Sequence, residues 1–163
     1  MQKPRIFIGS SVESLPIADA INENLDHSAE VAIWRNGIFH LSDNTLDALI
    51  EKAKTFDYAI FIFSPDDIAT IRNVEQKVAR DNVVFELGLF IGTLGKERCF
   101  VVKPRNTDLH LPTDLLGLTT ADYDTNRSDG DLASALNYAC SLIKKAMGRR
   151  GVPPLPPGRP FPL

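Results

Sequence analysis

The sequence predicts a single α/β domain in which helices cover both faces of a parallel β-sheet. Short, continuously apolar runs alternate along the chain with segments of helical periodicity, an order that implies βαβ crossovers. The runs lack the polar alternation of a half-exposed strand, so both faces of each strand should be buried. The chain has 163 residues, 44% of them hydrophobic, which is enough for one complete core.

The elements of the first half are justified by their periodicity. The apolar run at 5–9 ends in Gly-Ser-Ser, and apolar residues three or four apart then predict a helix at 16–25. A second short strand is expected at 31–34 and a second amphipathic helix at 45–54. The run at 58–63, YAIFIF, is the most apolar of the chain and is therefore predicted to be a central strand.

The second half continues the alternation. The Ser-Pro-Asp-Asp sequence at 64–67 indicates a turn, and a helix is predicted at 80–94. Strands at 98–102 and 116–122 and a closing helix at 132–147 complete the pattern. This order favours a flavodoxin-like three-layer sandwich with a five-stranded parallel sheet, whose ligands bind beyond the carboxyl ends of the strands.

Composition argues against a nucleic-acid-binding or membrane protein. The net charge is −3 and the lysines and arginines are scattered, so no basic surface is expected. No segment resembles a signal peptide or a membrane span, and Cys99 and Cys140 lie in apolar segments as buried free thiols would. We therefore expect a soluble, cytoplasmic protein. Residues 1–148 should form the domain, and the proline-rich residues 149–163 a tail or linker.

Two short segments at strand ends carry candidate ligand-binding residues. Ser10 and Ser11 follow the first strand, where small residues let backbone N–H groups and hydroxyls approach a phosphate. Ser11 as a helix cap is an equally good interpretation. Trp34 and Arg35 end the second strand and offer a stacking face and a phosphate-binding fork. Alternatively, Trp34 only finishes the strand and packs beneath the next helix.

Glu86 is the strongest catalytic candidate. At about 100° per residue it lies roughly 60° from Val83 and 40° from Phe90, at the border of the apolar stripe of the predicted helix. A carboxylate there should be partly desolvated and have a raised pKa, although an ordinary boundary glutamate paired with an arginine is a strong alternative. Asn82, one turn earlier, can orient Glu86 or a ligand hydroxyl. Three glycines lie off the stripe and predict close approach of another backbone: Gly88, Gly92 and Gly95.

The remaining polar residues do not indicate a metal site. His27, His40 and His110 are isolated and their spacing resembles no zinc motif. Asp66 and Asp67 fit a solvated turn better than a metal pair. No metal is therefore expected.

The motifs along the chain resemble a known family. They match the bacterial TIR-like domains that are predicted to bind nucleotides and that serve as effectors of cyclic-nucleotide-activated antiphage systems. The resemblance extends over residues 4–148, and its most specific block is RDNVVFELGLFIGTLG. The other matching blocks are RIFIGSS (5–11), FDYAIFIFSPDD (56–67), RCFVVKP (98–104) and LPTDLLGLT (111–119).

The resemblance implies NAD glycohydrolase activity with no further cofactor, because NAD+ is the substrate. The catalytic glutamate of the family falls on Glu86. The implied nucleotide pocket comprises Ser10, Ser11, Trp34 and Arg35, with Asp81 and Asn82 as weaker correspondences. Cleavage passes through an oxocarbenium-like centre that one carboxylate can stabilise or trap, because nicotinamide is a good neutral leaving group.

The resemblance also implies partners. The family couples this domain to a cyclic-nucleotide-sensing domain or chain and is activated by assembly through TIR–TIR contacts. Two other functions fit the same architecture: a non-catalytic TIR adaptor and a nucleoside deoxyribosyltransferase-like enzyme. Polar groups around the expected pocket favour catalysis over the adaptor.

Overall fold

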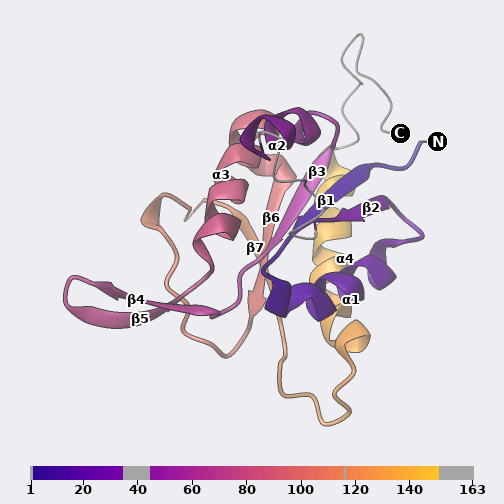
Figure 1. Cartoon of the computed structure of the whole chain (residues 1–163). Helices are drawn as coiled ribbons and strands as arrows, with labels where there is room; N and C mark the ends of the chain where they lie inside the picture. Colours follow the sequence, from indigo (N-terminus) through magenta and orange to yellow (C-terminus); the bar gives the residue numbers. More distant parts are fainter. Residues whose placement is uncertain (1, 35–44, 116, 151–163) are drawn as a thin grey trace.

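The chain folds around one parallel sheet of five strands. The computed structural model describes residues 2–34, 45–115 and 117–150, and in them the sheet has the order β2-β1-β3-β6-β7 (Figure 1). Its strands are β1 (Arg5–Gly9), β2 (Glu30–Ile33), β3 (Tyr58–Ile62), β6 (Cys99–Pro104) and β7 (Thr119–Tyr123). The helices are α1 (Leu15–Leu25), α2 (Thr45–Ala53), α3 (Asp81–Leu94) and α4 (Leu132–Arg150), with 3-10 turns at Val12–Ser14, Lys96–Arg98 and Thr113–Leu115. The predicted flavodoxin-like sheet is confirmed.

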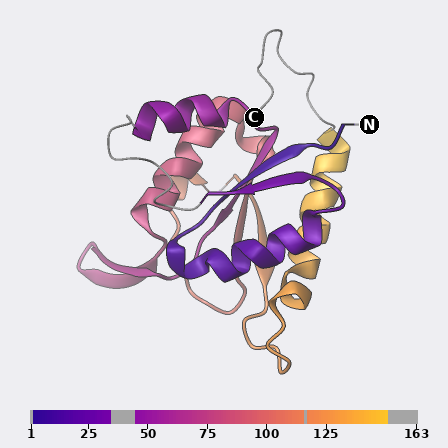
Figure 2. The same ribbon diagram turned by 45° about the vertical axis from the view of Figure 1, so that its right-hand side comes forward.

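The helices form two layers, one on each face of the sheet. Helices α1 and α4 lie together on one face, and α2 and α3 cover the other (Figure 2). The buried side chains accordingly form two clusters separated by the sheet. Successive residues of β1 serve the two clusters in turn, since Ile6 and Ile8 pack toward α1 and Phe7 packs toward α3.

An aromatic cluster fixes α3 on the sheet. The ring of Phe90 lies 4.3 Å from that of Phe7 and 5.5 Å from that of Phe61, measured between ring centroids. All three side chains are fully buried. Burying a phenylalanine side chain contributes about 1.5–3 kcal/mol, so these contacts anchor the helix over β1 and β3.

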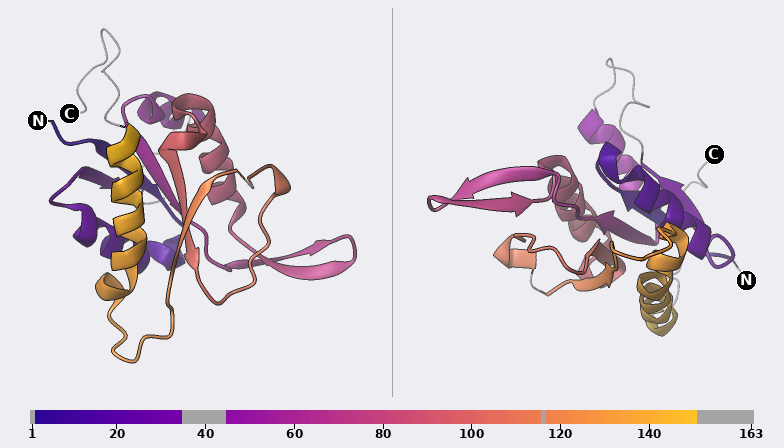
Figure 3. Two further views of the ribbon diagram at one scale, coloured as in Figure 1. Left: turned by 180° about the vertical axis from the view of Figure 1, so that it is seen from behind. Right: turned by 90° about the horizontal axis from the view of Figure 1, so that it is seen from below.

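A β-hairpin between β3 and α3 is absent from the sequence-based prediction, which placed only a turn there. Strands β4 (Asp67–Ile71) and β5 (Val74–Val78) pair antiparallel and extend away from the sheet and helices (Figure 3). Arg72 and Asn73 at the tip both have positive φ, 50° and 65°, as a two-residue hairpin turn requires. The prediction missed the hairpin because no Asn-Gly or Asp-Gly pair marks this turn.

Two smaller expectations are corrected by the structure. The last strand begins at Thr119 rather than at 116, which lies outside the described residues. Gly95 ends α3 with φ 90°. A Cβ atom at Gly88, Gly92 or Gly95 would meet nothing within 4 Å, so the prediction that another backbone approaches these glycines is wrong. These glycines face solvent.

The structure bears on the expectations about the cysteines and about membrane-spanning helices. Cys99 and Cys140 are buried free thiols, as predicted. Within the described residues, no helix is both long enough and apolar enough to span a bilayer.

Gly9 is the position where a glycine is sterically required. A Cβ there would lie 2.7 Å from two ring atoms of Phe61, whereas Gly88 has open space around it. Gly9→Ala should therefore destabilise the fold by about 1–3 kcal/mol through overpacking. The matched control Gly88→Ala should be neutral or stabilising by up to about 1 kcal/mol, because alanine favours the helix. Urea denaturation measures both, and equal stabilities would contradict the steric argument.

Candidate functional site

The candidate site lies at the carboxyl edge of the sheet, where the strand order reverses. The chain leaves β1 toward β2 through α1 and returns to β3, on the other side of β1, through α2. Such a switch point is the usual ligand site of an open α/β sheet. Ser10 and Trp34 are the first residues after β1 and β2, and Ser64 is the second residue after β3. Glu86 lies in the second turn of α3.

Glu86 is a buried carboxylate held by a tryptophan. Its side chain is only 7% exposed, and it accepts a hydrogen bond from the side chain of Trp34, whose indole N–H can only donate. Its Oε2 has no hydrogen-bond partner in the part of the chain that the structure describes. Burial raises the pKa of Glu86 to about 7, and the Trp34 hydrogen bond opposes this shift. The predicted border position and raised pKa are confirmed.

Trp34 connects the second strand to this carboxylate. Its backbone N–H donates to the carbonyl of Ile8 at 2.8 Å, which continues the strand pairing beyond β2. Its ring is buried, lies 5.6 Å from that of Phe7, and has the Lys52 ammonium 5.6 Å from its centroid. Trp34 thus finishes the strand and packs in the core, and it also orients Glu86. The sequence predicted a stacking face but not this hydrogen bond.

The two serines after β1 differ in their hydrogen bonding. Ser10 is 3% exposed and its Oγ has no partner among the described residues. The Ser11 hydroxyl donates to Oδ2 of Asp66 at 2.7 Å and makes no helix-capping bond. Ser11 occupies the N-cap position of the 3-10 turn at Val12–Ser14, as the cap interpretation expects, but its hydroxyl joins two strand ends instead of capping the turn.

A polar network that the sequence did not reveal surrounds these serines. The hydroxyls of Ser14 and Ser64 lie 2.6 Å apart, and Ser64 also hydrogen-bonds to Tyr123 at the end of β7. Burial raises the pKa of Tyr123. The position of Ser64 immediately after a predicted central strand was the available signal, since the ends of parallel strands share one edge.

The start of α3 is tied to the β1–α1 turn. Two nitrogens of Arg80 contact the two carboxylate oxygens of Glu13 at 2.9 and 3.0 Å, and one lies 3.4 Å from Asp67. A backbone hydrogen bond and then the Arg80 guanidinium lower the pKa of Glu13. This bidentate pair joins residues far apart in sequence and helps to position the helix that carries Glu86.

The remaining predicted pocket residues are not gathered around Glu86 by any described contact. Asp81 and Asn82 are exposed at the first turn of α3, where Oδ1 of Asp81 accepts the Asn82 backbone N–H at 2.7 Å. Arg35 lies outside the described residues.

The family comparison decides what kind of domain this is. Residues 5–125 match the model of the CAP12/Pycsar effector protein, TIR domain. The chain belongs to this family. This TIR domain is 44% identical to the Pycsar effector protein PaPycTIR of Pseudomonas aeruginosa over 92% of its length. It is 43% identical to the CD-NTase-associated protein 12 of Flavobacterium daejeonense over 91%. It covers 49% and 47% of those proteins, so it spans about half the length of the curated relatives it matches.

A solved structure supports the fold. The crystal structure of a diflavin flavoprotein A3 from Nostoc sp. matches with a TM-score of 0.54 and 17% identity. The match covers 92% of this chain and 97% of that one. At this identity the likeness concerns the flavodoxin-like fold alone.

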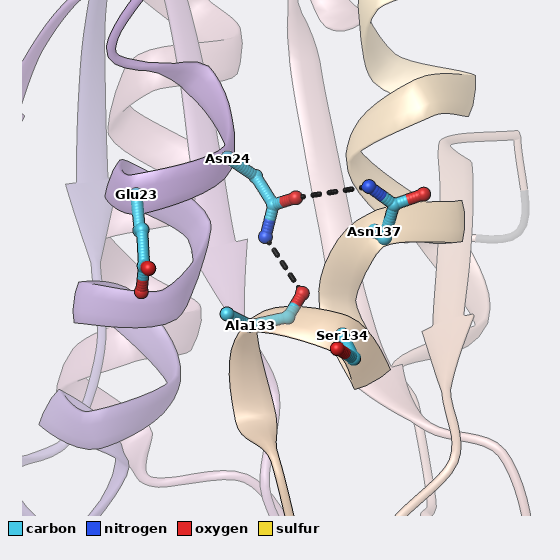
Figure 4. A pocket seen from close by; sticks show the side chains of 5 residues that line it. All are labelled: Glu23, Asn24, Ala133, Ser134 and Asn137. Carbon is cyan, nitrogen blue, oxygen red and sulfur yellow. Dashed lines mark hydrogen bonds between the residues drawn. The ribbon is translucent and has the colours of Figure 1, made fainter.

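A groove on the other side of the sheet has a structural role in the TIR domain. This groove of about 500 Å³ between α1 and α4 is lined by Glu23, Asn24, Ala133, Ser134 and Asn137 (Figure 4). Nδ2 of Asn24 donates to the Ala133 carbonyl at 2.9 Å, and the Asn137 amide donates to Oδ1 of Asn24 at 3.3 Å. Because these groups already bind one another, they join the two helices.

The described part of the chain contains no group of three or more His, Cys, Asp or Glu side chains that could hold a metal ion.

The buried Glu86 should make the stability of this TIR domain depend on pH. Its folded pKa of about 7 lies above the ordinary value of 4.5, so the folded state binds the proton more tightly. Its contribution to stability is therefore full below pH 4.5 and is lost as the pH rises through 7, a change of roughly 2–3 kcal/mol. Glu86→Gln should remove this loss.

The measurement is urea denaturation of wild type and Glu86→Gln at pH 5 and pH 8. The variant should gain stability over wild type at pH 8 and little at pH 5. Glu23→Gln, which changes an exposed carboxylate on α1, is the matched control and should follow the wild type. A Glu86→Gln variant with the pH dependence of wild type would show that Glu86 is not desolvated.

Proposed function

We propose that this TIR domain is an NAD glycohydrolase with Glu86 as its catalytic carboxylate. The observation that carries the proposal is the buried carboxylate of Glu86, oriented by a tryptophan N–H, at the switch point of the sheet. In the reaction, the bond between the nicotinamide nitrogen and ribose C1′ breaks, and nicotinamide leaves as a neutral molecule with the electron pair. Water adds to C1′ and a proton is released, which gives ADP-ribose. Attack on C1′ by a group of the same molecule in place of water gives a cyclised form.

One carboxylate is sufficient for this chemistry. Ordinary glycosidases use a second carboxylic acid to protonate the departing oxygen, but nicotinamide needs no proton to leave. The ionised Glu86 faces the positive charge that develops at C1′, and its burial strengthens that interaction because little water screens it. The same carboxylate can also trap C1′ covalently before water attacks.

The surrounding residues have separate parts in the proposal. Trp34 holds Glu86 through its N–H. The hydroxyl of Ser10 has no partner among the residues that the structure describes and is assigned to a substrate oxygen. Ser11 contributes mainly through its bond to Asp66, which shapes the loop after β1. Arg35, Asp81 and Asn82 are assigned to binding of the nucleotide, as the family resemblance implies. NAD+ is the substrate, and no further cofactor is needed.

The biological setting of the proposal comes from the relatives. They are named Pycsar effector proteins and CD-NTase-associated proteins and are about twice as long as this chain. We therefore assign this domain to a cytoplasmic effector of bacterial antiphage defence, controlled by a cyclic-nucleotide-sensing domain or chain. A nucleotide signal would act by promoting contact between copies of the TIR domain.

Nicotinamide release from NAD+ by concentrated protein tests the catalytic role. Glu86→Gln should lower the rate by about 10²-fold or more, because it removes the charge that stabilises the transition state. For wild type, kcat/KM should rise with pH and level off above an apparent pKa of about 7, since only the ionised carboxylate is active.

The outcomes distinguish the competing functions. Glu23→Gln should keep the wild-type rate. Equal release by wild type and Glu86→Gln would remove Glu86 from the mechanism, and exchange of bases on deoxynucleosides without NAD+ cleavage would identify a deoxyribosyltransferase. No turnover of either substrate at any protein concentration would favour the adaptor.

Self-association should use the projecting hairpin. Ile68 and Val74 on β4 and β5 are 65% and 57% exposed, and an isolated two-stranded hairpin gains stability when another surface covers it. Ile68→Asp should therefore weaken assembly in sedimentation velocity at high protein concentration and lower activity under the same conditions. Tyr138→Asp, which changes a similarly exposed side chain on α4, should do neither. Unchanged assembly of Ile68→Asp would place the contact elsewhere.

A further inference from the structure

Arg5 is a buried cation whose donors are largely unused. The residue is 4% exposed, and neither Nε, Nη1 nor Nη2 has a hydrogen-bond partner among the described residues. Its nearest opposite charge is Asp57, with Oδ2 3.9 Å from Nε, and that oxygen already accepts the Arg5 backbone N–H at 2.9 Å. Unfilled donors on a buried guanidinium are costly and uncommon in folded proteins.

The Arg5 side chain points into the layer of α2. Residues two apart in a strand share a face, and Phe7 packs in the cluster that contains Leu49 of α2. In agreement, Arg5 lines a cavity of about 360 Å³ between the edge strand β2 and α2. The other lining residues are Glu30, Val31, Ala32, Lys52, Thr55 and Phe56. This cavity begins at the amino ends of the strands. Ser10 and Glu86 lie at the opposite, carboxyl edge of the sheet.

Lys52 supplies a second cation in this cavity. The residue is exposed, and Lys52 and Glu30 are the exposed members of the lining, so the cavity opens to solvent on their side. The Thr55 hydroxyl is not available as a donor, because it binds the Lys52 carbonyl at 2.7 Å. Two carboxylates lie near these cations: Asp57, which is paired with Arg5, and Glu30, which lines the cavity at its mouth.

We propose that Arg5 and Lys52 form a binding site for the phosphate group of a small organic phosphate. A guanidinium fork and a flexible ammonium together match the charge and the several acceptor oxygens of a phosphate. The cavity is larger than one phosphate needs, and its apolar walls, Val31, Ala32 and Phe56, fit the organic part of the ligand. The Lys52 side chain moves toward the anion, and the buried Arg5 donors become satisfied.

The chain carries its own reporter for this site. Trp34 is the single tryptophan, and the Lys52 ammonium lies 5.6 Å from the centroid of its ring. An anion that draws Lys52 away changes the cation–π contact, so the intrinsic fluorescence of Trp34 should respond to binding. The same contact connects the anion site to the residue that orients Glu86.

The test is titration of the full chain with inorganic phosphate and with adenosine monophosphate at constant ionic strength, followed by calorimetry and Trp34 fluorescence. Both probes should bind, and the nucleotide more tightly because it also contacts the apolar walls. Lys52→Met should weaken binding roughly tenfold or more, since a charged donor is lost. Lys54→Met, whose exposed ammonium pairs with Glu51 at 2.8 Å, is the matched control and should leave binding unchanged.

Arg5→Lys keeps a cation beside Asp57 while removing the guanidinium fork, so it tests Arg5 without leaving the buried carboxylate unpaired. It should also weaken binding. If neither probe binds, the proposal is overturned. If the two probes bind with equal affinity, the assignment of the apolar walls to the organic part of the ligand is wrong. Binding that Ser10→Ala weakens and Lys52→Met does not would place the anion at the carboxyl edge instead. None of these outcomes depends on NAD+ cleavage.

Discussion

The packing of Phe90 against Phe7 and Phe61 is the contact on which the site depends. It presses α3 onto the two central strands, and one turn earlier along the same face of α3 stands Glu86. Because neighbouring turns of a helix share a face, anchoring Phe90 also draws the Glu86 carboxylate out of water. The aromatic contacts thus offset the free energy that the fold loses by burying an acid.

The desolvation of Glu86 has opposite effects on stability and on the proposed catalysis. A carboxylate with one hydrogen bond from a neutral donor destabilises the fold in its ionised form, which the raised pKa expresses. The same poor solvation leaves the ionised group free to stabilise a cationic centre that arrives with a substrate. Sites that break a folding rule in this way are where function is expected.

Buried polar groups without partners occur at both ends of the sheet. Within the described residues, those at the carboxyl edge are Ser10 Oγ and Glu86 Oε2, and those at the amino edge are the side-chain nitrogens of Arg5 and Nη1 of Arg98. By contrast, the polar groups of Asn24 between α1 and α4 are hydrogen-bonded. A hollow whose walls bind one another stabilises the fold, whereas a hollow with unfilled donors or acceptors is suited to a ligand. This difference separates the structural groove from the cavity at Arg5 better than their volumes do.

The sequence by itself determined the layers, the five parallel strands and the border position of Glu86. These follow from local periodicity, which acts over a few residues and can be read directly. It did not reveal the β4–β5 hairpin, whose tip at Arg72 and Asn73 lacks the usual turn residues. Only the tertiary structure decided that, within the described residues, the Arg5 side chain has no hydrogen-bond partner. It also decided that Trp34 donates to Glu86 and that Ser11 binds Asp66. Those contacts join residues some fifty positions apart, and local preference carries no information about such distant pairings.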